Sequence, residues 1–275
     1  MLTRKIPSTG ESIPAVGLGT WQTFDPPSLD AEHLRPLHDV LRTFFDLGGR
    51  VVDSSPMYGN AEQVTGNLST KLNINAKLFL ATKVWTRGKD AGVQQMQASF
   101  EKLGRKNSKL DLMQVHNLLD WQTHLPTLIE WKSQGKLRYI GVTHYVASAF
   151  DELERIMSTQ EIDFVQLPYS LAMRKADDRL LPMARDKAIA VVVNRPFEEG
   201  ALFTKVRGKE LPDSARGFAS TWAEAFLKFI LANEAVTCVI PATNKLDHLR
   251  DNMSAGRGPL PDAAECKTLI DVLNA

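Results

Sequence analysis

The feature that most constrains the fold is an eightfold alternation of a short apolar run with a longer amphipathic segment. The apolar runs are VGLGTW, VVDSS, LFLATKV, LDLMQVH, RYIGVTH, IDFVQL, AIAVVVNRP and AVTCVIPA. In the first segment between them, Leu34, Leu37, Leu41 and Phe45 recur at helical spacing. Strands that alternate with helices form parallel sheets, and eight such units close into a barrel. The alternation therefore predicts an α/β fold, a (β/α)8 TIM barrel.

The segments between and after these runs predict eight helices. They are expected near residues 29–49, from 61, 93–103, 125–133, from 148, 180–187, 221–232 and 245–253. The first helix is expected to begin at a cap formed by Ser28 or Asp30. We also expect an N-terminal β-hairpin and, from AGRGPLPDAAECKTLIDVL, a short C-terminal helical extension outside the barrel. A chain of 275 residues can bury one large core, so residues 1–275 are expected to form one domain.

The charges of the chain are nearly balanced, with 33 basic and 32 acidic residues and a formal net charge of +1. This balance favours a small-molecule partner over nucleic acid or an anionic membrane. Cys238 and Cys266 form no CxxC pair, and no metal-ligand spacing occurs, so neither a disulfide framework nor a metal site is expected. No apolar run approaches the roughly 18 residues of a membrane span. We expect a cytoplasmic protein, although a signal removed before Met1 would be invisible.

Polar residues close most of the apolar runs. In a (β/α)8 barrel the active site lies at the carboxyl ends of the strands, so side chains from distant positions meet there. Any strand turns polar as it leaves the core, so one such residue alone indicates little. Three successive strands that end in Asp, Lys and His, with a Tyr just past the first, favour a site. The residues at these ends are Asp53, Lys83, His116, Thr143, His144, Gln166 and Asn194, with Tyr58 five residues after Asp53.

The first three of these residues, together with Tyr58, can deliver a proton. A tyrosine has a pKa of about 10, so it cycles protons near neutrality only if a cation stabilises its phenolate. Lys83 can supply that charge, and Asp53 can keep the buried ammonium protonated. His116 can donate a hydrogen bond to a carbonyl oxygen and orient it for protonation by Tyr58. These roles predict carbonyl reduction, which also requires a hydride donor.

With these motifs in place, the chain resembles the aldo-keto reductase superfamily over nearly its whole length. The matching blocks are VGLGTW, residues 53–62, ATKVW, LDLMQVHN, QGKLRYIGVTHY, VQLPYS, NRPFEEGALF and VIPATNKLDHLRDN. The resemblance implies an NAD(P)H-dependent reductase on a (β/α)8 barrel that requires no metal. It places Asp53, Tyr58, Lys83 and His116 on the catalytic tetrad, with Tyr58 as general acid. His116 favours carbonyl reduction over reduction of conjugated carbon–carbon bonds.

The resemblance also implies a set of cofactor contacts, some of which depart from the usual pattern. Thr143 and His144 stand where Ser-Asn is commoner, and Asn194 replaces a tyrosine that stacks on the nicotinamide. The loop that follows is expected to span the pyrophosphate, where a glycine lets the backbone approach phosphate oxygens. The cofactor-binding residues expected are Thr143, His144, Gln166, Asn194, Phe197, Gly200, Leu202, Thr243, Lys245, Asp251 and Asn252.

The adenosine end decides between NADPH and NADH. Ala242 and His248 occupy positions that are Lys and Arg in strongly NADPH-selective members of the family. Lys245 and Arg250 remain close by in the sequence and can supply cations for a 2′-phosphate, although both can equally belong to a solvated helix face. We therefore expect NADPH as the cofactor, with use of both NADPH and NADH as the alternative.

Three tryptophans follow strands and are expected to line an apolar substrate pocket: Trp21, Trp85 and Trp121. The alternative for them is packing over the barrel rim. The short C-terminal segment implies that the lid found in many relatives is reduced. A reduced lid leaves the pocket open and favours small or varied carbonyl substrates.

The expected function is that of a monomeric carbonyl reductase acting on aldehydes and some ketones. The alternative is an NADP(H)-binding regulatory or interaction protein on the same barrel with slow turnover, because such proteins can retain the four residues. A more remote alternative is a phosphate-substrate barrel enzyme of another family, which would leave Tyr58 without a role.

Overall fold

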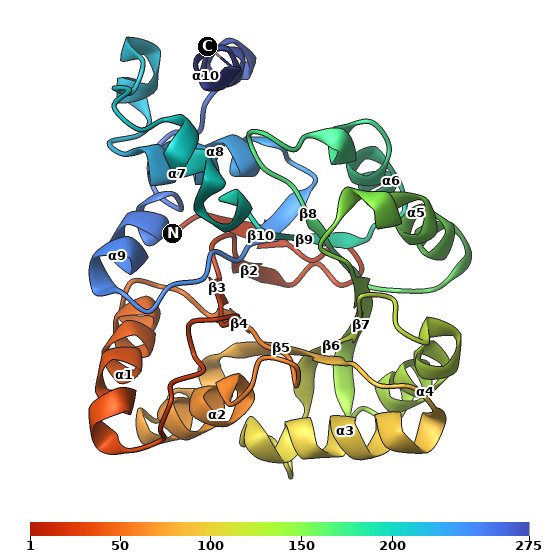
Figure 1. Cartoon of the computed structure of the whole chain (residues 1–275). Helices are drawn as coiled ribbons and strands as arrows, with labels where there is room; N and C mark the ends of the chain where they lie inside the picture. Colours follow the sequence, from red (N-terminus) through yellow and green to blue (C-terminus); the bar gives the residue numbers. More distant parts are fainter. Residues whose placement is uncertain (275) are drawn as a thin grey trace.

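The computed structural model describes residues 1–274, in which eight parallel strands form a barrel surrounded by helices (Figure 1). Each strand pairs with the next along the chain: β3 (Leu18–Gly19), β4 (Val51–Asp53), β5 (Phe79–Val84), β6 (Leu110–His116), β7 (Leu137–Thr143), β8 (Phe164–Pro168), β9 (Ala190–Asn194) and β10 (Val236–Val239). Parallel bridges from Val16 to Val239 and from Gly19 to Ala242 join the first and last strands. The sheet therefore closes, and the predicted (β/α)8 barrel is confirmed.

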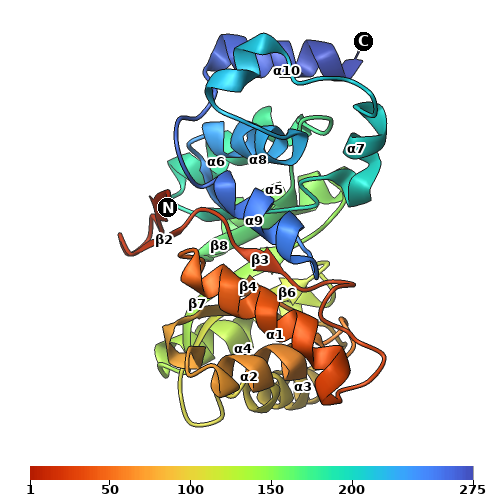
Figure 2. The ribbon, with the colours of Figure 1, turned by 90° about the vertical axis from the view of Figure 1, so that its left-hand side faces the viewer.

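Helices follow the strands around the outside of the barrel. They are α1 (Ala31–Asp46), α2 (Ala61–Lys71), α3 (Lys89–Lys102), α4 (Trp121–Ser133), α5 (Phe150–Thr159), α6 (Leu180–Asp186), α7 (Ala201–Lys205), α8 (Trp222–Ala232), α9 (Leu246–Ser254) and α10 (Ala263–Asn274). Short 3-10 turns lie at Asn75–Lys77, Ala147–Ala149, Lys175–Asp177, Glu198–Gly200 and Asp213–Gly217. Figure 2 shows α10 beyond α8 and away from the strands, as expected for a C-terminal extension.

Two helices begin four residues earlier than the sequence pattern predicts, α3 at Lys89 and α4 at Trp121. The side chain of Asp120 connects their starts: its Oδ2 accepts from the N–H of Gly88 at 2.7 Å, and its Oδ1 accepts from the hydroxyl of Thr123 at 2.8 Å. These first turns, KDAG and WQTH, contain Trp121 as their one large apolar residue, so hydrophobic spacing does not reveal them. At α1 the cap is Asp30, whose Oδ1 accepts from the N–H of His33 at 3.0 Å.

Side chains alternate between the barrel interior and the helix layer. Phe79, Tyr139 and Phe164 fill the interior, with ring centroids 5.4 to 6.0 Å apart. An antiparallel hairpin of β1 (Thr3–Lys5) and β2 (Ser12–Pro14) adds Ile6 and Ile13 to this interior cluster. Because successive strand residues point to opposite faces, Lys83 has the same inward orientation as Phe79. The alternation that builds the core therefore also directs the polar strand ends inward.

Several features of residues 1–274 bear on the classes of site that the fold can carry. None of their helices combines the length and apolar character that a bilayer crossing requires. Nowhere in this part of the chain do three His, Cys, Asp or Glu side chains gather in an arrangement that could hold a metal ion. Cys238 is a free, buried thiol inside the barrel, and Cys266 is a free, partly buried thiol on α10.

Candidate active site

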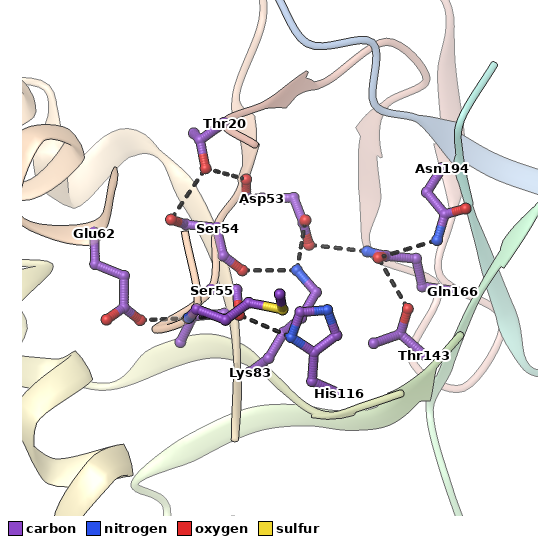
Figure 3. Close-up of polar contacts among 12 residues, drawn as sticks. Thr20, Asp53, Ser54, Ser55, Glu62, Lys83, His116, Thr143, Gln166 and Asn194 are labelled. Atoms are coloured by element: carbon purple, nitrogen blue, oxygen red, sulfur yellow. Dashed lines mark hydrogen bonds and ion pairs between the residues drawn. The ribbon is translucent and has the colours of Figure 1, made fainter. Parts of the chain in front are cut away.

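A buried ion pair lies at the centre of the site, at the carboxyl ends of β4 and β5. Lys83 Nζ donates to Asp53 Oδ2 at 2.6 Å and to the backbone oxygen of Ser54 at 2.7 Å (Figure 3). Lys83 is fully buried and Asp53 nearly so. Burial lowers the pKa of Lys83, and the adjacent Asp53 carboxylate partly offsets this effect. Asp53 therefore helps to keep a cation inside the barrel.

Tyr58 lies beside this pair in the loop after β4. Lys83 Nζ is 5.2 Å from the centre of the Tyr58 ring, and the Tyr58 ring meets the His116 ring edge-on with centroids 5.7 Å apart. Burial and the charge of Asp53 raise the pKa of Tyr58 well above its ordinary value. This direction is opposite to the one expected from Lys83, because burial and the charge of Asp53 dominate the pKa of Tyr58. Tyr58 is therefore a protonated phenol, the form that can donate a proton.

The turn that carries Tyr58 depends on Gly59. Gly59 has a φ of +56°, and a Cβ atom there would lie 2.2 Å from Asp25 Oδ2. Asp25 Oδ1 accepts from the N–H of Asn60 at 2.9 Å, which ties this turn to the loop after β3. A glycine is therefore required both for the left-handed backbone and for the close approach of Asp25.

His116 ends β6 and faces Tyr58. Its Nδ1 lies 2.9 Å from the Ser55 hydroxyl, which accepts from the N–H of Met57 at 3.3 Å. The Ser55 hydroxyl can therefore donate its own proton to Nδ1, which leaves the His116 proton on Nε2. Burial, followed by the charge of Lys83, lowers the pKa of His116 to about 2. His116 is thus a neutral imidazole that presents an N–H donor.

A chain of amides and hydroxyls connects the other strand ends to the ion pair. Gln166 Nε2 donates to Asp53 Oδ1 at 2.9 Å, and Gln166 Oε1 accepts from the Thr143 hydroxyl at 3.0 Å (Figure 3). Asn194 Nδ2 donates to the backbone oxygen of His144 at 3.1 Å. Asn194 Oδ1 is buried and accepts no hydrogen bond from residues 1–274. A buried acceptor without a partner suits a donor that a ligand brings.

His144 begins the loop after β7. Its Nδ1 accepts from the backbone N–H groups of Tyr145 at 3.0 Å and of Val146 at 3.3 Å. Partial burial lowers the pKa of His144. The ring is therefore neutral, with its proton on Nε2. It stacks on the ring of Tyr145 with centroids 5.4 Å apart.

The loop after β9 contains three of the expected cofactor residues. Gly200 has a φ of +94°, and a Cβ atom there would meet nothing within 4 Å. The ring of Phe197 packs against Phe203 with centroids 5.0 Å apart. Leu202 is fully buried in the core between the barrel and its helices. The Leu202 side chain faces the core, so a contact between Leu202 and the cofactor, which stays a prediction, would have to come from the backbone.

The four residues expected at the adenosine end lie on and just before α9. Thr243 is buried, and its hydroxyl accepts from the N–H of Lys245 at 3.1 Å. Lys245 itself is exposed, whereas Asn252 is buried. Asp251 accepts from the hydroxyl of Thr221, at the start of α8, at 2.6 Å. The residues expected to bind the adenosine end of the cofactor therefore form a partly exposed surface, with the cation of Lys245 at its edge.

The three tryptophans expected in the pocket separate into two groups. Trp21 and Trp85 are 38% and 40% exposed, and the Trp85 ring lies 6.4 Å from the His116 ring between centroids. Trp121 instead begins α4, is buried, and donates from Nε1 to Glu152 Oε1 at 2.8 Å. The prediction for Trp121 is wrong because α4 starts earlier than expected and turns the indole towards α5.

Comparison with known proteins identifies this arrangement. The sequence profile of the Aldo/keto reductase family matches residues 15–267. The chain belongs to the aldo-keto reductase family. It is therefore an oxidoreductase.

Two curated relatives of this aldo-keto reductase come from Escherichia coli (strain K12). The NADH-specific methylglyoxal reductase is 27% identical over 248 residues, which cover 78% of this chain and 73% of the relative. Methylglyoxal reductase YeaE is 25% identical over 247 residues, which cover 88% and 84%. An aldo/keto reductase from Klebsiella pneumoniae, solved in complex with NADP and acetate, has the same fold, with a TM-score of 0.78 and 23% identity over 98% of this chain and 94% of that one.

Sequence reasoning missed several residues that the aldo-keto reductase fold brings to the site. The Thr20 hydroxyl donates to the backbone oxygen of Asp53 at 2.9 Å, and it closes an apolar run just as Asp53 does. The same strand-end signal could have identified it. Glu62 on α2 is buried and accepts from the Thr82 hydroxyl at 2.5 Å. Nothing in the polar sequence of α2 marks Glu62 as buried.

The contact between Ser55 and His116 supports a first prediction. Ser55→Ala is expected to lower kcat for carbonyl reduction about fivefold to tenfold, because His116 loses the neutral hydrogen bond that selects its tautomer. Steady-state kinetics with a fixed aldehyde would measure this. Ser54→Ala is the matched control, since the Ser54 hydroxyl lies 3.0 Å from the Thr20 hydroxyl. Equal losses in both variants would contradict the tautomer role.

Proposed function

We propose that this aldo-keto reductase reduces an aldehyde or ketone with hydride from a nicotinamide cofactor and a proton from Tyr58. The observation that carries the proposal is the pairing of a protonated phenol with a neutral imidazole donor, their rings 5.7 Å apart, beside a buried ion pair. The Nε2–H of His116 can donate to the carbonyl oxygen and orient it. Tyr58 then delivers its proton to the same oxygen as charge develops there.

The residues present fit the carboxamide end of a nicotinamide cofactor. When bound, the cofactor supplies the hydride. Asn194 offers a buried acceptor, Oδ1, that has no partner elsewhere in residues 1–274, and His144 offers a proton on Nε2. Thr143 and Gln166 would complete the amide contacts, since both belong to the same hydrogen-bonded chain. These groups bind and orient the ring; Tyr58 and His116 perform the proton chemistry.

For the other end of the cofactor we propose NADPH, with NADH also accepted. The exposed cations Lys245 and Arg250 can supply donors to a 2′-phosphate. Ala242 adds no positive charge at that end, so NADH, which has no 2′-phosphate, can also bind. The relatives differ in their cofactor, since one is named NADH-specific and the Klebsiella structure contains NADP.

We propose that the substrate is a small carbonyl compound. Trp21, Met57, Trp85 and Tyr145 are exposed at the carboxyl ends of four strands, so the mouth of the barrel is apolar and open. Both curated relatives described above are named methylglyoxal reductases, so a 2-oxoaldehyde is the first substrate to test. The single closed sheet supports action as one domain. We expect the protein to act as a monomer.

The test is the loss of nicotinamide absorbance when the purified protein receives NADPH, and then NADH, with methylglyoxal and a panel of other reactive aldehydes and dicarbonyls. Turnover is expected with both cofactors and should be faster with NADPH. Tight cofactor binding without turnover across the panel would contradict the proposal and favour a regulatory or interaction protein on the same barrel.

A further inference from the structure

An acidic side chain that the proposed proton chemistry does not use lies buried in the helix layer next to β5. Glu62 belongs to the first turn of α2, four residues after Tyr58, and is 1% exposed. Its Oε1 accepts from the hydroxyl of Thr82, on β5, at 2.5 Å (Figure 3). An acidic side chain is rarely buried this completely. The contact therefore joins the start of α2 to β5 at a site that solvent does not reach.

The surroundings of Glu62 do not explain its burial by stability alone. Its second oxygen, Oε2, and the hydroxyl of Ser99 on α3 are both buried, and neither has a hydrogen-bond partner in the described part of the chain. Burial raises the pKa of Glu62, and the Thr82 hydroxyl only partly offsets this effect. Buried polar atoms without partners lower stability, and such costs are typical of functional sites. The position of Glu62 therefore calls for a functional explanation.

On one side, Glu62 is coupled to the turn that carries Tyr58. The N–H of Tyr58 donates to the backbone oxygen of Ser55 at 3.0 Å, and the N–H of Ala61 donates to the backbone oxygen of Tyr58 at 3.1 Å. The helix continues directly from this turn, since the N–H of Val64 donates to the backbone oxygen of Asn60 at 2.9 Å. A displacement of the first turn of α2 therefore also displaces Tyr58.

On the other side, the contact reaches the strand that carries Lys83. Thr82 directly precedes Lys83 on β5 and is fully buried. Successive strand residues face opposite sides of a sheet, so Thr82 faces α2 while Lys83 faces the barrel interior. Lys83 Nζ lies 5.2 Å from the centre of the Tyr58 ring. The contact between Glu62 and Thr82 thus connects the backbone of the proposed proton donor to the backbone of the neighbouring cation.

We propose that Glu62 is a positioning residue for Tyr58: its contact with Thr82 holds the Tyr58 turn against β5 and so sets the separation of the phenol from Lys83. The inference rests on the proposed function, in which Tyr58 delivers the proton. A neutral side chain of the same shape can make the same contact. The inference therefore predicts that the hydrogen-bonding shape of Glu62 is required and that its negative charge is not.

The kinetic test is a double-mutant cycle between Glu62 and Thr82. Glu62→Leu and Thr82→Val should each lower the single-turnover rate of carbonyl reduction about 10- to 100-fold, since a small displacement of a reacting group has effects of this size. The double variant should lose no more than the larger single loss, because both changes remove one contact. Glu62→Gln should stay within about twofold of the wild-type rate, since its amide oxygen can still accept from Thr82.

Two measurements separate this role from general destabilisation. The dissociation constant for NADPH, from calorimetric titration, should change less than about twofold in every variant, because the loss is one of positioning and not of cofactor binding. Ser69→Ala is the matched control, since Ser69 is a buried hydroxyl on the same helix that accepts from Asn75 Nδ2 at 2.8 Å. It should lower Tm and leave the rate of reduction unchanged. An equal loss of rate in Ser69→Ala would overturn the inference.

A readout that does not depend on turnover is the NMR spectrum of protein labelled with ¹³C in its four tyrosines. The Tyr58 signal, assigned by its absence in Tyr58→Phe, should move in Glu62→Leu and Thr82→Val but not in Glu62→Gln. If the wild-type protein reduces carbonyls and the first two variants keep both the rate and the signal, the inference is wrong and the proposed function stands. If the signal moves as expected but the wild-type protein reduces no carbonyl, the proposed function is wrong, and Glu62 still positions Tyr58.

The alternative role for Glu62 is that of a second negative charge acting on Lys83. In that case Glu62→Gln would lose as much activity as Glu62→Leu, and the decline of the rate at alkaline pH would begin at a lower pH in both variants. That result would overturn the positioning role. The expected result is that Glu62→Gln keeps the pH profile of the wild-type protein.

Discussion

Tyr58→Phe is expected to lower kcat for carbonyl reduction by about 10²- to 10⁴-fold, the range over which a positioned general acid acts. The substitution removes the phenolic proton and keeps the ring, so the edge-on contact with His116 remains. The dissociation constant for NADPH should change less than twofold, because no cofactor contact is assigned to the Tyr58 hydroxyl. Single-turnover absorbance and calorimetric titration measure the two quantities separately.

The matched control for this prediction is Tyr145→Phe. Tyr145 lies at the same mouth and is 47% exposed, and no proton role is assigned to it. The Tyr145→Phe variant should retain most of the wild-type rate of carbonyl reduction. Reduction at a normal rate by Tyr58→Phe would show that another group donates the proton. Because burial keeps the pKa of Tyr58 above its ordinary value of 10, ionisation of the phenol should not lower the wild-type rate as the pH rises to 10.

Lys83→Met is expected to lose most activity and to lower the free energy of unfolding by about 3–5 kcal/mol, the usual cost of leaving a buried charge without its partner. Lys83 is fully buried and donates to Asp53 at 2.6 Å, so solvent cannot replace the ammonium. Burial lowers the pKa of Lys83 below its ordinary 10.5. Wild-type reduction should therefore decline with rising pH before 10.5, as the cation is lost.

The double variant Lys83→Met with Asp53→Asn separates stability from catalysis. It replaces the ion pair with neutral groups, and the amide oxygen of the new asparagine can still accept from Gln166, as Asp53 does at 2.9 Å. Stability measured by urea unfolding should recover much of the loss, while activity stays low. Normal reduction by Lys83→Met across the pH range would show that Tyr58 does not depend on this cation.

The sequence predicted where the proposed catalytic residues lie better than it predicted their electrostatics. Asp53, Lys83 and His116 each close an apolar run, and inward alternation brings them together as expected. The direction of the shift in the pKa of Tyr58 did not follow from residue types. It depends on which group pairs with Lys83 and on how deeply the phenol is buried. Both are properties of the packed structure.

Boundaries and side-chain directions were the other features that the pattern missed. Trp121 was expected at the pocket, but α4 begins at that residue and buries the indole. The burial of the Leu202 side chain in the core was likewise not evident from the sequence. The first turn of α4 has one large apolar residue and α7 has only five residues, so neither shows a clear helical period. A shift of one residue in that period rotates a side chain by about 100°.

The sequence by itself determined the barrel, because eight apolar runs alternating with amphipathic segments can bury their surface in few other ways. It also determined which residues stand at the strand ends, since chain order and period set those positions. Only the tertiary structure decided what each of these residues does to its neighbours. The Ser55 hydroxyl lies 2.9 Å from His116 Nδ1, and Asp53 accepts from both Lys83 and Gln166. These contacts join residues that lie far apart in the sequence. Their strength depends on the distance between the groups and on their burial, which only the folded chain determines.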